Sequence, residues 1–172
     1  MKDRIELAKY FTELGFKTGV EIGVSKGAYS RELCQTNPKL KLYCVDTWGI
    51  HDRSQGRRDL HMKIYKYAKW KLSRHNTVLI RDLSMNAVKQ FDDNSLDFIY
   101  IDANHTYECV MEDIIAWTPK VRAGGIVSGH DYQLPEVKRA VDDYIKDKNI
   151  DLVVTEQDTI REHPSWLFIK KL

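Results

Sequence analysis

Residues 20–27, which read Val-Glu-Ile-Gly-Val-Ser-Lys-Gly, decide the fold of this chain. The apolar run that ends at Ile22 is typical of a buried strand, and Gly23 and Gly27 allow a tight turn close to a ligand. A helix is expected next, from Ala28 to about Cys34, with its free N–H groups directed at the turn. Strand, glycine turn and helix in this order predict the first unit of an α/β sheet.

The rest of the chain continues this alternation in both directions. Leu7, Phe11 and Leu14 recur at helical spacing upstream, and Gly15 is a plausible end of that helix. Further strands are expected at 18–22, 40–45, 77–80, 96–101 and 126–128, and further helices within 47–76 and around 84–90, 107–114 and 137–145. This alternation predicts a mainly parallel sheet with helices on both faces.

The last two expected strands, 152–154 and 166–169, have no helix between them. Without a crossover helix they cannot pair in parallel, so we expect an antiparallel hairpin at one edge of the sheet. The fold class is therefore α/β, a doubly wound sheet that is mostly parallel with an antiparallel C-terminal edge.

One domain is expected over residues 1–172, because a chain of this length can bury enough apolar surface to fold without staples. Residues 47–76 form the longest insertion on the side where a ligand would bind, and they are a candidate lid. The helix inside this insertion is expected to bury one apolar face, made of Leu60, Ile64, Tyr67, Ala68 and Leu72.

Positive charge gathers in the same insertion. The net charge of the chain is +2, yet residues 51–76 carry eight lysines and arginines against two aspartates. A solvated helix face is the simplest interpretation, and a surface for an anionic substrate or nucleic acid is the alternative. This chain lacks the interleaving of aromatic and basic residues that is typical of single-strand binders, so we expect no nucleic-acid partner. Few residues remain for a substrate domain, so a homo-oligomer in which a second subunit completes the site stays open.

The chain shows no apolar run near the roughly 20 residues that cross a bilayer, and its first residues resemble neither a signal peptide nor a lipidation site. The three cysteines are odd in number and lack metal-site spacing, and Cys44 lies in an apolar run. These features predict a cytoplasmic protein with reduced cysteines and no membrane partner.

Ligands of open α/β sheets bind at the carboxyl ends of the strands. Asp46, 19 residues after Gly27, ends the second expected strand, where a carboxylate can accept hydrogen bonds from both hydroxyls of a ribose. A glycine turn or an aspartate after a strand is common by itself. Their order within one strand–helix–strand unit predicts a ligand of the adenosine type.

Glycine spacing and charge distinguish two such ligands. A dinucleotide site needs G-x-G-x-x-G so that pyrophosphate can lie on the helix N-terminus, whereas this chain has G-x-x-x-G. Glu21 stands two residues before the first glycine, and a carboxylate there would repel pyrophosphate but attract the ammonium group of a methionine moiety. S-adenosylmethionine is therefore favoured over NAD.

The motifs together resemble those of class I S-adenosylmethionine-dependent methyltransferases. Residues 20–27 resemble the first motif of that group and residues 43–46 the second. The runs 101–108, Ile-Asp-Ala-Asn-His-Thr-Tyr-Glu, and 124–131, Gly-Gly-Ile-Val-Ser-Gly-His-Asp, resemble the methyltransferase-24 type. That type is related to metal-dependent O-methyltransferases of natural-product sugars and of catechols. The resemblance extends over residues 18–132 and implies a single Rossmann-like domain, the class I methyltransferase fold.

The family pattern also implies a set of cofactor-binding residues. It would place Glu21, Gly23 and Gly27 at the methionine end, and Asp46 at the ribose. The whole set carried over is Glu21, Gly23, Ser25, Gly27, Asp46, Thr47, Trp48, Asp82 and Asp102. Asp82 would contact the adenine amino group. Ser25 departs from the glycine most common in the middle of the first motif, but serine is small and can donate a hydrogen bond.

A divalent metal ion is implied at Asp102, His130 and Asp131. The catechol-type enzymes have an aspartate–asparagine pair after the fifth strand, where this chain has His130-Asp131. Two carboxylates suit Mg²⁺, while histidine favours Mn²⁺, Fe²⁺ or Zn²⁺. The alternative is structural: Asp102 would cap the next helix and Asp131 would bond to nearby backbone amides.

His105 is the first candidate for the catalytic base, since it lies where the catechol-type enzymes place a lysine, and His130 is the second. The function expected is methyl transfer to the hydroxyl of a small molecule, with or without a metal ion. The alternatives are a metal-independent O- or N-methyltransferase, a nucleotide-dependent oxidoreductase, and a non-catalytic module that keeps the cofactor cleft.

Overall fold

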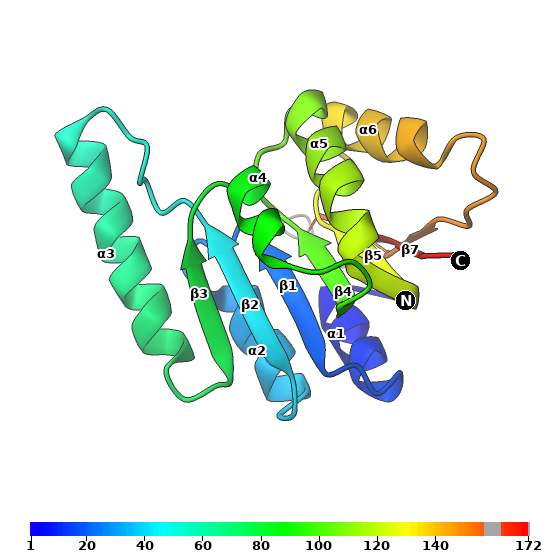
Figure 1. Ribbon diagram of the computed structural model, residues 1–172, viewed down its shortest axis with the longest axis horizontal. Helices are drawn as coiled ribbons and strands as arrows, with labels where there is room; N and C mark the ends of the chain where they lie inside the picture. Colours follow the sequence, from blue (N-terminus) through cyan, green and yellow to red (C-terminus); the bar gives the residue numbers. More distant parts are fainter. Residues whose placement is uncertain (157–162, 172) are drawn as a thin grey trace.

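The sheet of this protein has seven strands in the order β3-β2-β1-β4-β5-β7-β6 (Figure 1). The structure is a computed structural model, and it describes residues 1–156 and 163–171. The strands are β1 Thr18–Ile22, β2 Lys41–Asp46, β3 Thr77–Arg81, β4 Leu96–Ile101, β5 Val121–Gly129, β6 Val153–Val154 and β7 Trp166–Ile169. The strands from β1 to β5 pair in parallel, while β7 runs antiparallel to both β5 and β6. The predicted parallel sheet and antiparallel edge are confirmed.

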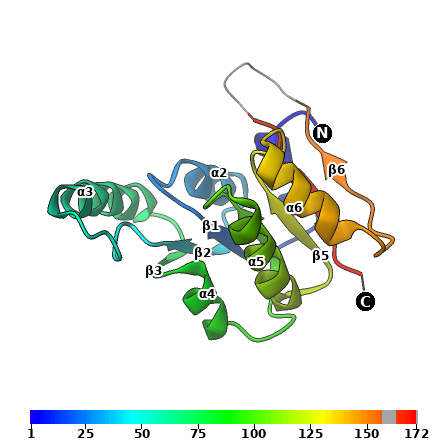
Figure 2. The ribbon, with the colours of Figure 1, turned by 90° about the horizontal axis from the view of Figure 1, so that it is seen from above.

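Helices cover both faces of the sheet (Figure 2). They are α1 Arg4–Glu13, α2 Ala28–Thr36, α3 Gln55–Leu72, α4 Ser84–Ala87, α5 Tyr107–Trp117 and α6 Pro135–Ile145, with short 3-10 turns at Val88–Gln90 and Thr118–Lys120. One apolar core joins the sheet to α4, α5 and α6, and a second joins it to α1, α2 and α3. Two cores on opposite faces are the doubly wound arrangement that the alternating sequence predicts.

Helix α3 departs from the expectation for its buried face. Among its residues only Ala68 and Leu72 are buried, while Leu60 is 56% exposed and Tyr67 45% exposed. The expectation that Leu60 and Tyr67 share the buried face is therefore wrong. The helix lies at the β3 end of the sheet (Figure 1), so only a narrow side of it meets the rest of the protein. Helical periodicity alone does not tell how wide that side is.

Two further expectations concern single features. Cys44 is buried, as the apolar run around it predicts, and Cys34 is buried as well. No helix within the described ranges is long and apolar enough to cross a membrane. Whether residues 47–76 act as a lid stays a prediction.

Candidate functional site

A cavity of about 730 Å³ opens at the carboxyl ends of β1, β2, β3 and β4. The chain turns from β1 toward β2 on one side and from β4 toward β5 on the other, so the cavity lies where the strand order reverses. Its walls are formed by Ile22, Gly23, Ser25, Val45, Asp46, Thr47, Asp82, Leu83, Ser84, Met85, Asp102, Ala103, Asn104, Cys109, Glu112 and Asp113. Six of the nine residues predicted to bind the cofactor are among them.

Gly23 makes the floor of this cavity possible. Its φ is +93°, and a Cβ atom at this position would lie 1.9 Å from the carbonyl oxygen of Asp102. The end of β1 therefore passes directly against the end of β4, an approach that only glycine permits. The Gly23 N–H donates to the Val45 carbonyl (2.8 Å), which ties the turn to β2 as well.

Asp46 organises the turn from β2. One carboxylate oxygen accepts a hydrogen bond from the Ser25 N–H (2.8 Å), and the other accepts one from the Trp48 N–H (2.7 Å). These bonds fix the carboxylate at the cavity wall, where each oxygen keeps a second lone pair for a ligand.

Glu21, Gly27 and Trp48 do not line the cavity. Glu21 is 2% exposed and accepts a hydrogen bond from the Ser30 hydroxyl, and burial raises the pKa of its carboxyl to about 8. The Trp48 ring is buried, packs on Tyr65 and donates from Nε1 to the Ser25 carbonyl (2.9 Å). Gly27 is the N-cap residue of α2 and has a φ of +67°. These three residues support the loops around the cavity from behind.

The charge of the cavity wall is strongly one-sided. Five carboxylate side chains line it, from Asp46, Asp82, Asp102, Glu112 and Asp113. Among the residues that the structure describes, no lysine or arginine belongs to the wall. A wall of this kind attracts a cationic ligand and repels phosphate groups.

Ser84, Glu112 and Asp113 are wall residues that the sequence reasoning missed. The Ser84 hydroxyl donates to the Asp113 carboxylate and accepts from Nε1 of Trp117 (2.7 Å), so α4 and α5 are joined beside the cavity. Burial raises the pKa of Asp113 to about 6. The available signal was a carboxylate on the apolar face of α5, since Asp113 lies among the buried side chains of Val110, Ile114 and Trp117.

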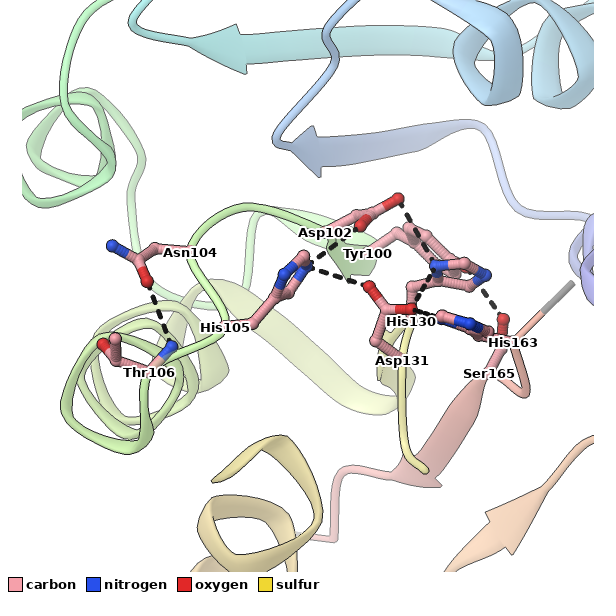
Figure 3. A network of polar contacts seen from close by, with 9 residues as sticks. All are labelled: Tyr100, Asp102, Asn104, His105, Thr106, His130, Asp131, His163 and Ser165. Carbon is pink, nitrogen blue, oxygen red and sulfur yellow. Dashed lines mark hydrogen bonds and ion pairs between the residues drawn. The ribbon is translucent and has the colours of Figure 1, made fainter. Parts of the chain in front are cut away.

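A second polar cluster lies beside the cavity, around Asp131 (Figure 3). Asp131 is 6% exposed and has a φ of +60°, and three histidines surround its carboxylate. His105 approaches one oxygen through Nε2 (2.9 Å); His130 approaches the other through Nδ1 (3.3 Å), and His163 contacts that same oxygen through Nδ1. Asp102 faces this cluster, 3.6 Å from His105 Nε2 and 3.8 Å from His130 Nδ1.

The cluster shifts the acidity of its members. Burial alone would raise the pKa of Asp131, but hydrogen bonds from His130 and His163 and the charges of the nearby imidazoles hold it well below the usual range. A hydrogen bond with Asp102 raises the pKa of His105, and the negative charge of Asp131 raises it further. Partial burial of the imidazole opposes this change. Asp131 therefore stays ionised beside its histidines, ready to hold a cation.

One group of side chains in the described part of the chain could hold a metal ion, namely Asp102, His105 and Asp131. One ligand atom of each lies within 4.8 Å of the others. The sequence-based set contained His130 in place of His105. The alternative was that Asp102 caps the next helix, α5. At the start of that helix the Thr106 N–H donates to the side chain of Asn104 (3.0 Å) and not to Asp102, so this role finds no support there.

His163 was missed, although the predicted hairpin contained a signal for it. Because β7 runs antiparallel to β5, its first residue, Trp166, pairs with Gly129, the last residue of β5. Residues just before β7 must therefore lie at the carboxyl edge of the sheet, next to Asp131.

Comparison with protein families matches residues 20–132, more than half of the chain, to a family described as a methyltransferase domain, of the methyltransferase-24 type. A curated relative, the uncharacterised protein y4gI of Sinorhizobium fredii, is 26% identical over 125 residues, which are 69% of this chain. The match spans only 13% of that relative's length.

Solved structures share the fold at low sequence identity. The O-methyltransferase TomG of Streptomyces achromogenes, involved in tomaymycin synthesis and solved with S-adenosylmethionine, is 13% identical, with a TM-score of 0.76 over 98% of this chain and 80% of that one. An O-methyltransferase of Bacillus cereus, solved with S-adenosylhomocysteine, is 13% identical, with a TM-score of 0.70 over 97% and 80% of the two chains.

Spermidine synthase of Thermotoga maritima also shares the fold, at 16% identity and a TM-score of 0.65, over 98% of this chain and 60% of that one. Because one fold carries different reactions, these likenesses establish the architecture alone. The family match is a match of sequence, and its range of residues 20–132 contains the glycine turn, Asp46 and the residues around Asp102 and Asp131. The chain therefore belongs to the methyltransferase domain family.

Proposed function

We propose that this protein transfers the methyl group of S-adenosylmethionine to a hydroxyl group of a small molecule. The observation that carries the proposal is the carboxylate-lined cavity at the strand ends. S-adenosylmethionine has a sulfonium and an ammonium group and no phosphate, so its charge complements this wall, whereas the pyrophosphate of NAD does not.

The cavity wall suggests how the cofactor lies. Gly23 and Asp102 offer a close backbone approach and a carboxylate to the methionine end, and Asp46 is oriented to accept bonds from the ribose hydroxyls. Asp82 and Ser84 line the wall where the chain enters α4, and we assign the adenine ring to this part of the cavity. Held in this way, the sulfonium faces the cluster around Asp131.

The donors of that cluster fit a divalent metal ion. Asp102 and Asp131 offer carboxylate oxygens and His105 an imidazole nitrogen, and His105 Nε2 is 2.9 Å from Asp131 and 3.6 Å from Asp102. With nitrogen in the set, Mn²⁺, Fe²⁺, Co²⁺ and Zn²⁺ suit it better than Mg²⁺. Such an ion, when bound, would polarise the acceptor hydroxyl and lower its pKa.

The residues of the chain perform the remaining tasks. Methyl transfer from a sulfonium is an in-line displacement, and aligning the acceptor oxygen with the methyl carbon supplies much of the acceleration, with effective molarities of about 10⁵ M or more. Asp102 lies both on the cavity wall and in the cluster, so it joins cofactor site and acceptor site.

A metal-independent mechanism is the second candidate, and the contact between His105 and Asp131 favours it. With Nε2 hydrogen-bonded to that buried carboxylate, Nδ1 of His105 can accept the proton of an acceptor hydroxyl or amine. His105 has a half-exposed side chain, which leaves it accessible to an acceptor.

Calorimetric titration tests the proposal. S-adenosylhomocysteine should bind at micromolar concentration, and NADH at the same concentrations should not bind. Asp46→Ala should weaken the binding at least tenfold, because the ribose loses its acceptor, while Asp59→Asn on the exposed side of α3 should leave it unchanged. NADH binding with no response to S-adenosylhomocysteine would contradict the proposed cofactor.

The role of a metal ion is tested in the same protein after treatment with a chelator. If an ion assists the reaction, Mn²⁺ or Co²⁺ should bind the wild-type protein and should bind His105→Ala and Asp131→Asn at least tenfold more weakly. Methylation of a hydroxyl acceptor that persists in the chelated protein would favour the pair of His105 and Asp131 as the base.

A further inference from the structure

A small cavity of about 10 Å³ adjoins the cluster, and its lining residues are Ile101, Ala103, Asn104, His105, Val110, His130, Val137 and Trp166. Two buried nitrogen atoms belong to the residues around it, Nε2 of His130 and Nε1 of Trp166. Within residues 1–156 and 163–171, neither atom has a hydrogen-bond partner. The Trp166 side chain is completely buried, and that of His130 is 13% exposed.

Two unpaired nitrogens at one cavity call for a common partner. A buried polar group without a hydrogen bond costs about 1–3 kcal/mol, and native proteins satisfy nearly all of them. The indole N–H can only donate, so the shared partner must accept from Trp166. A cavity of about 10 Å³ is close to the smallest that holds one water molecule.

We propose that one water molecule occupies this cavity, where it accepts a hydrogen bond from Trp166 Nε1 and donates one to Nε2 of His130. His130 is then the neutral tautomer with its proton on Nδ1. This assignment matches the other side of the ring, because Nδ1 faces the carboxylates of Asp131 (3.3 Å) and Asp102 (3.8 Å), which can only accept when ionised.

His130 is consequently a positioning residue for Asp131. A metal ion bound through Nδ1 would require the opposite tautomer, with the proton on Nε2. We therefore assign the ligating role to His105 and the orienting role to His130, whose N–H holds a carboxylate in a residue with a φ of +60°. The positioning role rests on the proposed metal site, while the tautomer and the water do not.

The tautomer can be measured directly. In the full chain labelled with ¹⁵N-histidine and freed of metal, a long-range ¹H–¹⁵N correlation spectrum distinguishes protonated from unprotonated ring nitrogens. At pH 8 we expect His130, assigned by its loss in His130→Asn, to be protonated at Nδ1 only. A proton on Nε2 in place of Nδ1 would overturn the proposal.

Trp166→Phe removes the indole N–H and retains an aromatic ring. It should shift the Nε2 resonance of His130, because the bridging water loses its donor. An Nε2 resonance that is unchanged in a folded Trp166→Phe protein would rule out the bridge. The wild-type spectrum tests the tautomer even if this variant does not fold.

Two substitutions of His130 distinguish a role for its Nδ1–H in orienting Asp131 from a role for the size of its side chain. The amide nitrogen of His130→Asn takes the place of Nδ1, whereas that of His130→Gln takes the place of Nε2. Mn²⁺ affinity should stay within about threefold of the wild-type value in the Asn variant and fall roughly 10- to 100-fold in the Gln variant. Equal losses in both variants would overturn the positioning role. A wild-type protein that binds no Mn²⁺ would instead count against the proposed metal site, with the tautomer measurement still decisive for the water.

Discussion

Glu21 shows how burial alters the meaning of a residue in a motif. The sequence interpretation used its negative charge to prefer a methionine moiety over pyrophosphate. In the structure the carboxyl is enclosed between Cys44 and Tyr100 on the neighbouring strands, and burial raises its pKa to about 8. At neutral pH Glu21 therefore keeps its proton. The negative charge that favours a cationic cofactor comes from the cavity wall.

This buried carboxyl predicts a pH-dependent stability. The pKa of Glu21 is about 8 in the folded protein against an ordinary value of 4.5, so the folded state binds a proton more tightly. Its contribution to the free energy of unfolding is complete below pH 4.5 and is lost as the pH rises to about 8, at about 1.4 kcal/mol per pKa unit. Urea denaturation from pH 5 to pH 9 measures this loss.

Glu21→Gln is the matched control for that measurement, because its amide cannot ionise and still meets Ser30. Over the same pH range the free energy of unfolding of the variant should fall less than that of the wild type. Parallel profiles for the two proteins would show that Glu21 does not carry the effect.

Gly23 gives a second prediction at the scale of one residue. Gly23→Ala should lower the free energy of unfolding by on the order of 3 kcal/mol, because its Cβ would overlap the Asp102 carbonyl and its φ is +93°. Thermal denaturation measures the change. Gly56→Ala is the control: no atom lies within 4 Å of that Cβ and the site is in α3, so stability should stay equal or rise by up to about 1 kcal/mol. Equal behaviour of the two variants would contradict the close approach of β1 and β4.

Helix α3 is attached to the domain by few side chains. Leu72 is completely buried and lies close to the turn at Gly27, whereas Trp70, two residues away, is 69% exposed. The outward face of the helix also carries much of the positive charge of the insertion. The helix is therefore held mainly through its C-terminal half, where Ala68 and Leu72 are buried and Ile64 and Tyr65 pack against the same core.

Paired substitutions in α3 test this attachment. Leu72→Ala should cost about 2–5 kcal/mol, since it leaves a cavity beneath the glycine turn. Trp70→Ala should change the free energy of unfolding by no more than about 0.5 kcal/mol, despite removing a larger side chain. Chemical denaturation of both variants provides the comparison, and a large effect of Trp70→Ala would mean that α3 is covered in solution.

The strands and helices could be predicted because most of them obey simple periodicity. The β4 strand was predicted with its observed bounds, and the α5 and α6 helices within a few residues. The buried side of α3 could not be predicted, because periodicity marks an apolar side and not the surface it meets. Leu60 and Tyr67 satisfy the pattern of a buried face and are nevertheless exposed.

At the scale of the whole molecule, the site residues also fall into those that could be predicted from the sequence and those that could not. Gly23 and Asp102 follow directly after strands and Asp46 is the last residue of one, and the rule that such residues meet at one edge of the sheet predicted that they lie together. Asp113 and His163 reach the same region from a helix and from the edge hairpin, so their positions depend on tertiary packing. Glu21 belongs to the motif, yet its side chain is enclosed behind the turn.

The distribution of charge over the molecule leads to a further prediction. Carboxylates gather at the cavity and cations on α3, so the affinity for S-adenosylmethionine should fall severalfold between 0.05 and 0.5 M NaCl through screening. Glu112→Gln should reduce both the affinity and its salt dependence. Lys66→Gln, which removes a charge from an exposed residue of α3 that does not line the cavity, is the control. A salt-independent affinity would show that the wall does not act through its charge.

The carboxylate wall also bears on how the site empties after each turnover. In the proposed reaction the cofactor loses its sulfonium charge when the methyl group departs, and it leaves as a neutral thioether. The same five carboxylates that attract the reactant therefore hold the spent cofactor less tightly. Such a site would favour exchange of product for fresh cofactor through electrostatics alone, and it would limit inhibition by accumulated product.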